Sequence, residues 1–293
     1  MADCIVIDTY PDFIEYWDEF CQMPIEQQIE GWASMYMAHW PELLDKQIKE
    51  YANENVDWQQ VARDKIFPFL KERQPGIQLA HEFLLMSCQP IYMTTRQMFK
   101  YDVPLVFVLY VGIGLGAGWA TTYQHSSALL FGLENIAEEG WCKPEAIEGL
   151  IAHEIGHLVH LHYRVQAGKA IGSGPWWDLY TEGLAQRCEH RLLGKDSWHM
   201  ALGTGYHSWL KWCKENKRWL AAEFLRRVKC GEDVRPFFGS WFEVRGQKQS
   251  GYFLGHELVK RLEAHNSFEE IAVIDKIDDR FEQLVIEMAS EDT

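Results

Sequence analysis

The chain has 293 residues, and 28 lysine and arginine residues against 43 aspartate and glutamate residues give a formal net charge of −15. Hydrophobic residues at 47% and charged residues at 24% are typical of a globular protein and exclude a disordered or fibrous chain. The acidic balance argues against a broad nucleic-acid interface and against docking on anionic membranes, because both need clustered lysine and arginine.

The cysteines and the N-terminal residues bear on the compartment. The 7 cysteines contain no Cys-x-x-Cys pair, and an odd, scattered set is typical of reduced thiols rather than of a disulfide framework. The N-terminal residues lack the basic and apolar regions of a secretory signal. Glycines interrupt the most apolar segment, 103–120, so no membrane-spanning helix is predicted. We therefore expect a cytoplasmic protein.

The first hundred residues are predicted to be helical. Pro11, Pro24 and Pro41 each precede a helical pattern, at the position where a missing backbone N–H costs least. Apolar residues recur at spacings of three and four over 32–39 and 58–69. These stripes are most simply the core faces of helices, although their aromatic side chains could also line a peptide groove.

A short sheet is predicted to follow, with strands over 103–111, 119–123 and 127–133. The connections are too short for crossover helices, so the strands are expected to be antiparallel. Alternating glycines occupy 112–118, but their spacing is not that of a dinucleotide-binding loop, and no helix follows them. We interpret this segment as a turn or a bulged strand.

Helices return towards the C-terminus, and Ser267 with Glu270 forms a capping-box pattern at one helix start. The sequence therefore predicts a mainly α-helical protein with a small antiparallel sheet, of the α+β class. A helical N-terminal region, 1–100, is expected to pack on a catalytic region, 101–293, in one compact unit. The predicted C-terminal helices cover 144–163, 176–193, 206–229, 250–264 and 277–289.

The segment His153-Glu154-Ile155-Gly156-His157 carries the most informative chemistry. The two histidines are four positions apart, so on a helix both imidazoles can reach one ion. Zinc accepts two imidazoles and a carboxylate and leaves a fourth position for water. Glu154 is turned about 100° further round the helix, outside the ligand set but near that water, where a base is needed.

The composition of this helix supports a metal site. Its large aliphatic residues fall on one arc, whereas the two histidines lie opposite, beside Ala146, Gly149 and Gly156. That face has room for an ion and a second helix, and a purely structural histidine pair would usually lie among larger side chains. His160 and His162 are expected around the ligands or on the surface.

A third ligand is expected from another helix, and Glu182 is the candidate. Gly183 and Ala185 would allow this helix to approach the histidine helix closely. Asp178, one turn earlier on the same face, could accept a ring N–H from a ligand histidine and fix its tautomer. It could equally be an exposed carboxylate at the start of the helix.

Together these segments resemble the gluzincin metallopeptidases, the thermolysin and aminopeptidase N group, over about 131–262. His153, Glu154 and His157 match the helix that carries the zinc ligands and the base. Trp176-Trp177-Asp178-Leu179-Tyr180-Thr181-Glu182-Gly183-Leu184-Ala185 is similar to the aminopeptidase N segment that ends in Asn-Glu-Gly-Phe-Ala, whose Glu is the third zinc ligand. Some uncharacterised bacterial proteins predicted to be zinc proteases look similar too.

Two further segments extend the resemblance. Tyr252-Phe253-Leu254-Gly255 is similar to the family's Tyr-x-Lys-Gly, in which the tyrosine stabilises the tetrahedral intermediate. Phe131-Gly132-Leu133-Glu134-Asn135 is similar to Gly-Ala-Met-Glu-Asn, which lies beside the substrate and whose Glu grips its free amine. The resemblance thus implies an oxyanion role for Tyr252 and substrate binding by Gly132 and Glu134, although Glu134 could also begin an exposed acidic stretch.

The chain departs from the family at several points. Leu254 replaces the lysine, Glu134 stands closer to His153, and the separation from His157 to Glu182 is a few residues longer than in aminopeptidase N. The large N-terminal β domain of those aminopeptidases has no counterpart. Zinc binding and peptide hydrolysis are therefore expected, but aminopeptidase specificity is not.

The predicted function is hydrolysis of peptide bonds in a peptide or protein substrate, with one zinc ion per chain. Strand 127–133, as a sheet edge, would align an extended peptide. One alternative is a non-catalytic binding or regulatory protein stabilised by zinc, in which His160 or His207 would close the site as a fourth ligand. Another is an amide hydrolase that acts on substrates other than peptides.

Overall fold

The computed structural model describes residues 4–291. Its contacts divide the chain into two compact units, Met1–Ile151 and Ala152–Thr293. The division expected near residue 100 falls inside the first unit, because a strand at the start of the chain pairs with one that begins at Leu105. Within the described residues, no helix is both long enough and apolar enough to cross a bilayer.

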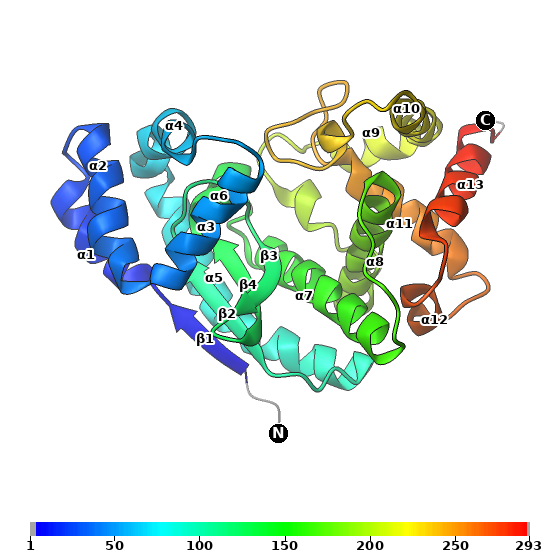
Figure 1. The fold of residues 1–293 in the computed structure, drawn as a ribbon, viewed down its shortest axis with the longest axis horizontal. Helices are drawn as coiled ribbons and strands as arrows, with labels where there is room; N and C mark the ends of the chain where they lie inside the picture. The colour runs from blue at the N-terminus through cyan, green and yellow to red at the C-terminus, as the bar shows by residue number, and fades with distance from the viewer. Residues whose placement is uncertain (1–3, 292–293) are drawn as a thin grey trace. The chain divides into compact units, whose positions relative to one another are not determined.

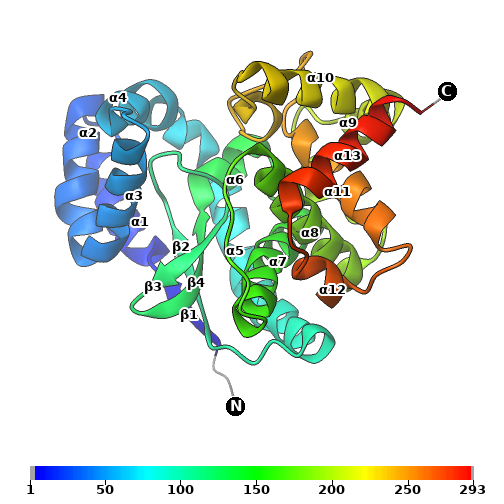
Figure 2. The ribbon, with the colours of Figure 1, turned by 45° about the vertical axis from the view of Figure 1, so that its right-hand side comes forward.

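The sheet of the first unit is mixed, so the expected antiparallel arrangement is wrong. Its strand order is β1-β2-β4-β3, in which β1, β2 and β4 run parallel and only β3 is antiparallel, paired with β4 (Figure 2). The chain leaves β2, forms β3 at the sheet edge, and turns back into β4 beside β2. The strands are β1 (Cys4–Asp8), β2 (Leu105–Tyr110), β3 (Trp119–Tyr123) and β4 (Ser126–Gly132).

Two consequences follow for the sequence predictions. The strand predicted over 127–133 is confirmed as β4, but β4 lies between β2 and β3 and is not a sheet edge. Its backbone is therefore paired on both sides and cannot align a peptide by adding a strand. β1 was not predicted, because its five residues lack flanking turn signals, and all of β2 is buried, as is usual for an interior parallel strand.

Helices make up the rest of the first unit, as predicted for the N-terminal region. α5 contacts β1 and β2, and Pro11 and Pro41 lie in the first turns of their helices. Two π-helical turns, η1 (Trp32–Tyr36) and η3 (Ala62–Ile66), follow directly from α2 and α4. The helices are α1 (Tyr10–Phe20), α2 (Ile25–Gly31), α3 (Pro41–Asn53), α4 (Trp58–Val61), α5 (Phe67–Phe99) and α6 (Leu133–Glu139), with a short 3-10 turn, η2 (Met37–His39).

The glycine segment after β2 forms a turn, as interpreted from its sequence. Gly114 has a φ of 93°, in the left-handed region that favours glycine. The carboxylate of Glu134 accepts hydrogen bonds from the backbone amides of Gly112 at 2.6 Å and Gly114 at 3.1 Å. The amide oxygen of Asn135 accepts another from Gly116. The start of α6 therefore holds this turn in place.

The second unit is helical, and α7 (Pro144–Gln166) leads into it from the first (Figure 1). The helix predicted over 206–229 is two helices, α9 and α10, which meet at Asn216, where φ is −108° and ψ is 12°. The capping box of Ser267 and Glu270 is confirmed. The remaining elements are α8 (Pro175–Leu193), η4 (His199–Leu202), α9 (Trp209–Glu215), α10 (Lys217–Cys230), η5 (Arg235–Phe237), α11 (Ser250–Leu262), α12 (Phe268–Ala272) and α13 (Ile277–Ala289).

Candidate metal centre

Three side chains from two helices of the second unit converge in one place. On α7, His153 and His157 present their rings with centroids 5.2 Å apart and planes at 76°. On α8, one carboxylate oxygen of Glu182 lies 3.0 Å from Nε2 of His153 and 3.6 Å from Nε2 of His157. The structure thus brings together the three residues that the sequence proposed as ligands.

The spacing of these atoms fits a zinc ion. Tetrahedral ligands at about 2.0–2.1 Å from the ion are separated from one another by about 3.3–3.4 Å. The two separations from Glu182, 3.0 Å and 3.6 Å, lie on either side of that value. Two imidazole nitrogens with one carboxylate oxygen are also the donor set of an open zinc site, in which a fourth position is left for water.

The three residues are strongly coupled electrostatically. Burial opposes ionisation of Glu182, but the two histidines outweigh it and hold the pKa of this carboxyl well below its usual range. Burial likewise opposes protonation of His157, yet Glu182 raises the pKa of this histidine to about 9. A negative carboxylate therefore faces a protonated imidazole, and a divalent cation would replace that proton.

Glu154 and Tyr252 lie beside the three proposed ligands. Glu154 is 8% exposed, and burial raises the pKa of its carboxyl, although His157 and His153 oppose the rise. The ring centroid of Tyr252, in the first turn of α11, lies 5.5 Å from that of His153. Helix packing thus brings Tyr252, which is 95 residues after His157 in the chain, close to the proposed ligands.

Small residues allow these helices to meet closely. A Cβ on Gly156 of α7 would lie 2.8 Å from Cα of Ala185, so Ala185 packs on α7 as the sequence predicted. Gly183 contacts a different helix from the one expected: a Cβ there would lie 2.3 Å from the carbonyl oxygen of Gly255 in α11. α8 is therefore packed between the helix of the histidines and the helix of Tyr252.

Two residues near the centre were missed by the sequence analysis. Glu189 is fully buried and His199 is 2% exposed, and donor atoms of both lie within 4.8 Å of each other and of a ring nitrogen of His153. Nδ1 of His199 lies 2.8 Å from the Glu189 carboxylate. Glu189 follows Glu182 by seven residues, two helical turns on the same face, and this spacing was the available signal.

Asp178, His160 and His207 do not join the three proposed ligands. Among the described residues, the Asp178 carboxylate makes no hydrogen bond to a ligand histidine, and the buried Nδ1 of His153 has no hydrogen-bond partner. Burial and the nearby Glu182 raise the pKa of Asp178 to about 6. His160 is buried between Trp177 and Tyr180. Neither His160 nor the exposed His207 belongs to a candidate metal group.

The residues expected to bind substrate lie in the first unit. Gly132, the last residue of β4, donates its backbone N–H to the carbonyl of Ala117 at 3.1 Å. Glu134 is 1% exposed and is not part of an exposed acidic stretch. Burial raises the pKa of Glu134 to about 7, despite its bonds from the amides of Gly112 and Gly114. Its substrate-binding role stays a prediction.

Comparison of the chain with protein-family models, curated proteins and solved structures finds no match. The chemistry of the site is therefore inferred from its geometry. Two imidazoles and a carboxylate are suited to a divalent cation, a buried carboxylate beside them can exchange a proton, and a phenol near them can donate a hydrogen bond.

Proposed function

We propose that the protein is a zinc-dependent hydrolase of peptide bonds, with the thermolysin-like arrangement that its motifs resemble. The observation that carries the proposal is the convergence of His153, His157 and Glu182, with separations of 3.0 Å and 3.6 Å from the carboxylate oxygen to the imidazole nitrogens. Glu154 and Tyr252 lie beside this cluster, and a site that only stabilises the fold needs neither.

Each residue has a role in this proposal. His153, His157 and Glu182 would hold one zinc ion, which when bound supplies a Lewis acid that activates water and polarises a carbonyl. Glu154 would accept a proton from the attacking water and deliver it to the leaving amine nitrogen. The Tyr252 hydroxyl would donate a hydrogen bond to the oxygen that becomes negative as the carbonyl carbon turns tetrahedral.

A zinc site that serves only binding or regulation is the second candidate. Structural zinc sites are closed by four protein ligands. Within residues 4–291, His199 is the one further histidine in a candidate metal group, but its group shares only His153 with the three proposed ligands. The donor set around Glu182 therefore favours an open site and a catalytic role.

The decisive experiment compares the wild-type protein with Glu154→Gln. Both proteins are purified without an affinity-tag metal, loaded with zinc, analysed for metal content, and assayed against a library of internally quenched peptides. We expect about one zinc per chain in both and a loss of turnover by at least about a hundredfold in the variant, as for removal of a general base. Equal turnover by the wild-type protein and Glu154→Gln would contradict the mechanism. If His153→Ala and Glu182→Ala lose zinc but neither the wild-type protein nor any variant cleaves a peptide, the binding role is favoured.

The same assay addresses substrate class. Peptides with a free amine and their N-acetylated twins separate an aminopeptidase, which requires the amine, from an endopeptidase. Simple acyl amides and anilides test the third possibility, an amide hydrolase that does not act on peptides. If the protein cleaves only the simple amides, the proposed roles of Glu154 and Tyr252 remain and only the proposed substrate class changes.

A further inference from the structure

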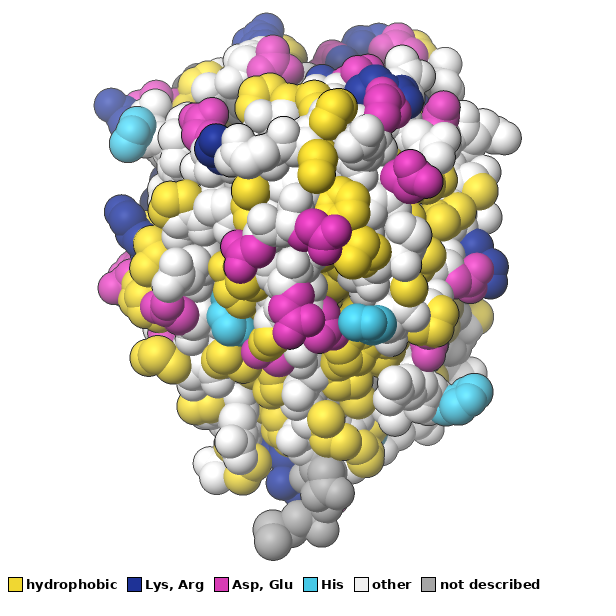
Figure 3. Space-filling model, turned by 90° about the vertical axis from the view of Figure 1, so that its left-hand side faces the viewer, with side chains coloured by type: hydrophobic (Ala, Val, Ile, Leu, Met, Phe, Trp, Pro, Cys, Tyr) yellow, Lys and Arg dark blue, Asp and Glu magenta, His cyan; other side chains and the backbone are white. Residues whose placement is uncertain are grey.

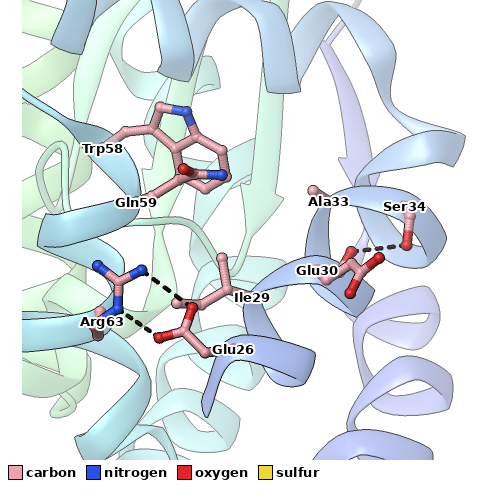
Figure 4. A pocket seen from close by; sticks show the side chains of 8 residues that line it. All are labelled: Glu26, Ile29, Glu30, Ala33, Ser34, Trp58, Gln59 and Arg63. Atoms are coloured by element: carbon pink, nitrogen blue, oxygen red, sulfur yellow. Dashed lines mark hydrogen bonds and ion pairs between the residues drawn. The ribbon is translucent and has the colours of Figure 1, made fainter.

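The first unit contains a pocket of about 630 Å³ between two helical segments. This volume lies within the range of about 300–1,000 Å³ that is usual for small-ligand sites. Figure 4 shows Trp58 and Arg63 on one side and Glu30, Ala33 and Ser34 on the other, with Ile29 between them. Ile29 is 4% exposed and gives the pocket an apolar floor.

The backbone around the pocket is unusual. The described residues contain two π-helical turns, and both line this pocket: η1 contributes Ala33 and Ser34, and η3 contributes Arg63. π-helical turns are rare, and they occur frequently at functional sites. Because residues of both turns line one cavity, this cavity is a candidate functional site.

The charges of the pocket favour a cation. Arg63 forms a bidentate ion pair with Glu26, with Nε at 2.6 Å and Nη2 at 3.1 Å from the two carboxylate oxygens, so these two charges offset each other. Glu30 remains, and no hydrogen bond or ion pair engages its carboxylate among the described residues. The charged residues that line the pocket, Glu26, Glu30 and Arg63, therefore have a formal net charge of −1.

The aromatic side chain of the pocket is suited to the same ligand. Trp58 is half-buried and rests on Trp32, with ring centroids 6.1 Å apart, which fixes its position without covering it. Tryptophan is the best of the aromatic residues at binding a cation over its ring face. The Trp58 indole and the Glu30 carboxylate line the same pocket, and each group attracts an alkylated guanidinium or ammonium group.

We propose that this pocket binds a small organic cation, an alkylguanidinium or alkylammonium group, between Trp58 and Glu30. The apolar stem of the ligand would lie on Ile29 and its charged end would contact the Glu30 carboxylate. A free small molecule and an arginine or lysine side chain of a peptide present the same cation chemistry, and the experiment below distinguishes these two sources. The site lies wholly in the first unit and does not depend on the metal centre.

The test follows the indole N–H resonances of the full chain labelled with ¹⁵N-tryptophan, in which the signal missing from Trp58→Leu identifies Trp58. Butylguanidinium is titrated against butylurea, which has nearly the same shape and no charge, at constant ionic strength. We expect butylguanidinium to shift the Trp58 signal with saturation, and butylurea to bind at least tenfold more weakly. Equal binding of the two compounds, or no shift with butylguanidinium, overturns the proposal.

Glu30→Gln and Glu50→Gln form the matched pair of variants. Both glutamates are exposed in the same unit, and only Glu30 lines the pocket. Glu30→Gln should weaken butylguanidinium binding at least fivefold, and Glu50→Gln should leave it unchanged. An unchanged affinity in Glu30→Gln contradicts the proposal, even where Trp58→Leu fails to fold. The source of the cation is tested with a Gly-Arg-Gly peptide blocked at both ends. If this peptide binds at least tenfold more tightly than butylguanidinium, the source is a peptide side chain. If the two bind equally, the source is a free cation.

Discussion

Gly183 of α8 and Gly255 of α11 pack backbone against backbone. A Cβ on Gly183 would lie 2.3 Å from the carbonyl oxygen of Gly255, and a Cβ on Gly255 would lie 2.3 Å from the carbonyl oxygen of Leu179. Glu182 precedes the first glycine by one residue, and Tyr252 precedes the second by three. The crossing therefore sets the distance between the proposed third ligand and the proposed oxyanion donor.

Gly183→Ala should disturb this crossing. The new methyl group meets backbone atoms, which cannot rotate away, so α8 and α11 must separate. We expect a loss of about 1–3 kcal/mol in the free energy of unfolding, the usual cost of overpacking, together with weaker zinc binding. Thermal unfolding and zinc titration measure the two effects. Leu193→Ala, at the exposed end of α8, is the control, and an unchanged zinc affinity in Gly183→Ala would show that the crossing does not position Glu182.

Zinc uptake should depend on pH through His157. In the metal-free protein Glu182 raises the pKa of this imidazole to about 9, so it is protonated at neutral pH. A metal ion needs the neutral ring, and binding between pH 6.5 and 8 should therefore release a proton from His157 and tighten about tenfold per pH unit. Calorimetric titrations in buffers of different ionisation enthalpy count the protons released.

Glu182→Gln is the informative comparison for this prediction. The amide removes the charge that keeps His157 protonated, so binding should be weaker overall and should depend less steeply on pH. A pH slope that is the same in the variant and the wild-type protein would mean that another group supplies the proton.

Glu189 is expected to be a structural support of His199. Its two carboxylate oxygens accept hydrogen bonds from the Ser197 hydroxyl at 2.7 Å, from the His199 backbone N–H at 3.0 Å and Nδ1 at 2.8 Å, and from Gln186 at 3.0 Å. Glu189→Ala leaves these buried donors unpaired. It should lower the free energy of unfolding by at least about 3 kcal/mol, because each unsatisfied buried group costs about 1–3 kcal/mol.

Glu189→Gln should cost clearly less than Glu189→Ala. The amide oxygen of the new glutamine can keep the hydrogen bonds from the Ser197 hydroxyl and the His199 backbone N–H. Its amide N–H can donate to Oε1 of Gln186 once the Gln186 amide flips, because this oxygen has no hydrogen-bond partner among the described residues. His199 would then change its ring tautomer so that Nδ1 accepts. Chemical denaturation of both variants measures the difference. Equal destabilisation would show that the charge of Glu189, and not its hydrogen-bonding capacity, is what matters.

The sequence predicted that His153, His157 and Glu182 would come together, and the part of that prediction that concerns the two histidines rests on local spacing. His153, Glu154 and His157 lie on one helix, where spacing alone fixes their directions. Gly183 shows the limit of this reasoning, since its lack of a side chain predicted a close helix contact, but the contact is with α11 and not with the histidine helix that we expected. Glu189 and His199 were missed because their pairing depends on the turn after α8, which no periodicity describes.

The sheet was predicted less well for a related reason. The strand segments 119–123 and 127–133 were placed correctly from their apolar and β-branched residues, but pairing between strands is a long-range property. β1 joins β2 from a hundred residues away and makes the sheet mixed. A reading of local connections therefore could not predict the parallel pairs or the interior position of β4.

Glu134 should make the stability of the first unit depend on pH. Burial raises the pKa of its carboxyl from 4.5 to about 7, so between these values the folded state holds a proton that the unfolded chain has lost. The contribution of Glu134 to stability should therefore fall as the pH rises through this window, by at most about 1.4 kcal/mol per pH unit.

Glu134→Gln tests this expectation, since an amide does not titrate. One of the two amide donors, Gly112 or Gly114, loses its acceptor, so the variant should be less stable at pH 4.5. The difference in the free energy of unfolding between the wild-type protein and Glu134→Gln should decrease towards pH 7, as measured by denaturant unfolding at several pH values. Glu50→Gln, at an exposed position, is the control, and a deficit that stays constant with pH would show that Glu134 is already ionised in the folded protein.

Tyr252→Phe separates a role in the transition state from a role in substrate binding. If the hydroxyl donates to the developing oxyanion, its removal should lower kcat by about a hundredfold or more and change KM little, as for loss of one oxyanion donor. Zinc content should be unchanged, because the tyrosine is not among the proposed ligands and its ring, 5.5 Å from His153, remains in place. Tyr163→Phe, a half-buried tyrosine on α7, should leave both constants unchanged. An effect of Tyr252→Phe confined to KM would assign the hydroxyl to substrate binding, because an interaction made equally in the ground state and the transition state does not change kcat.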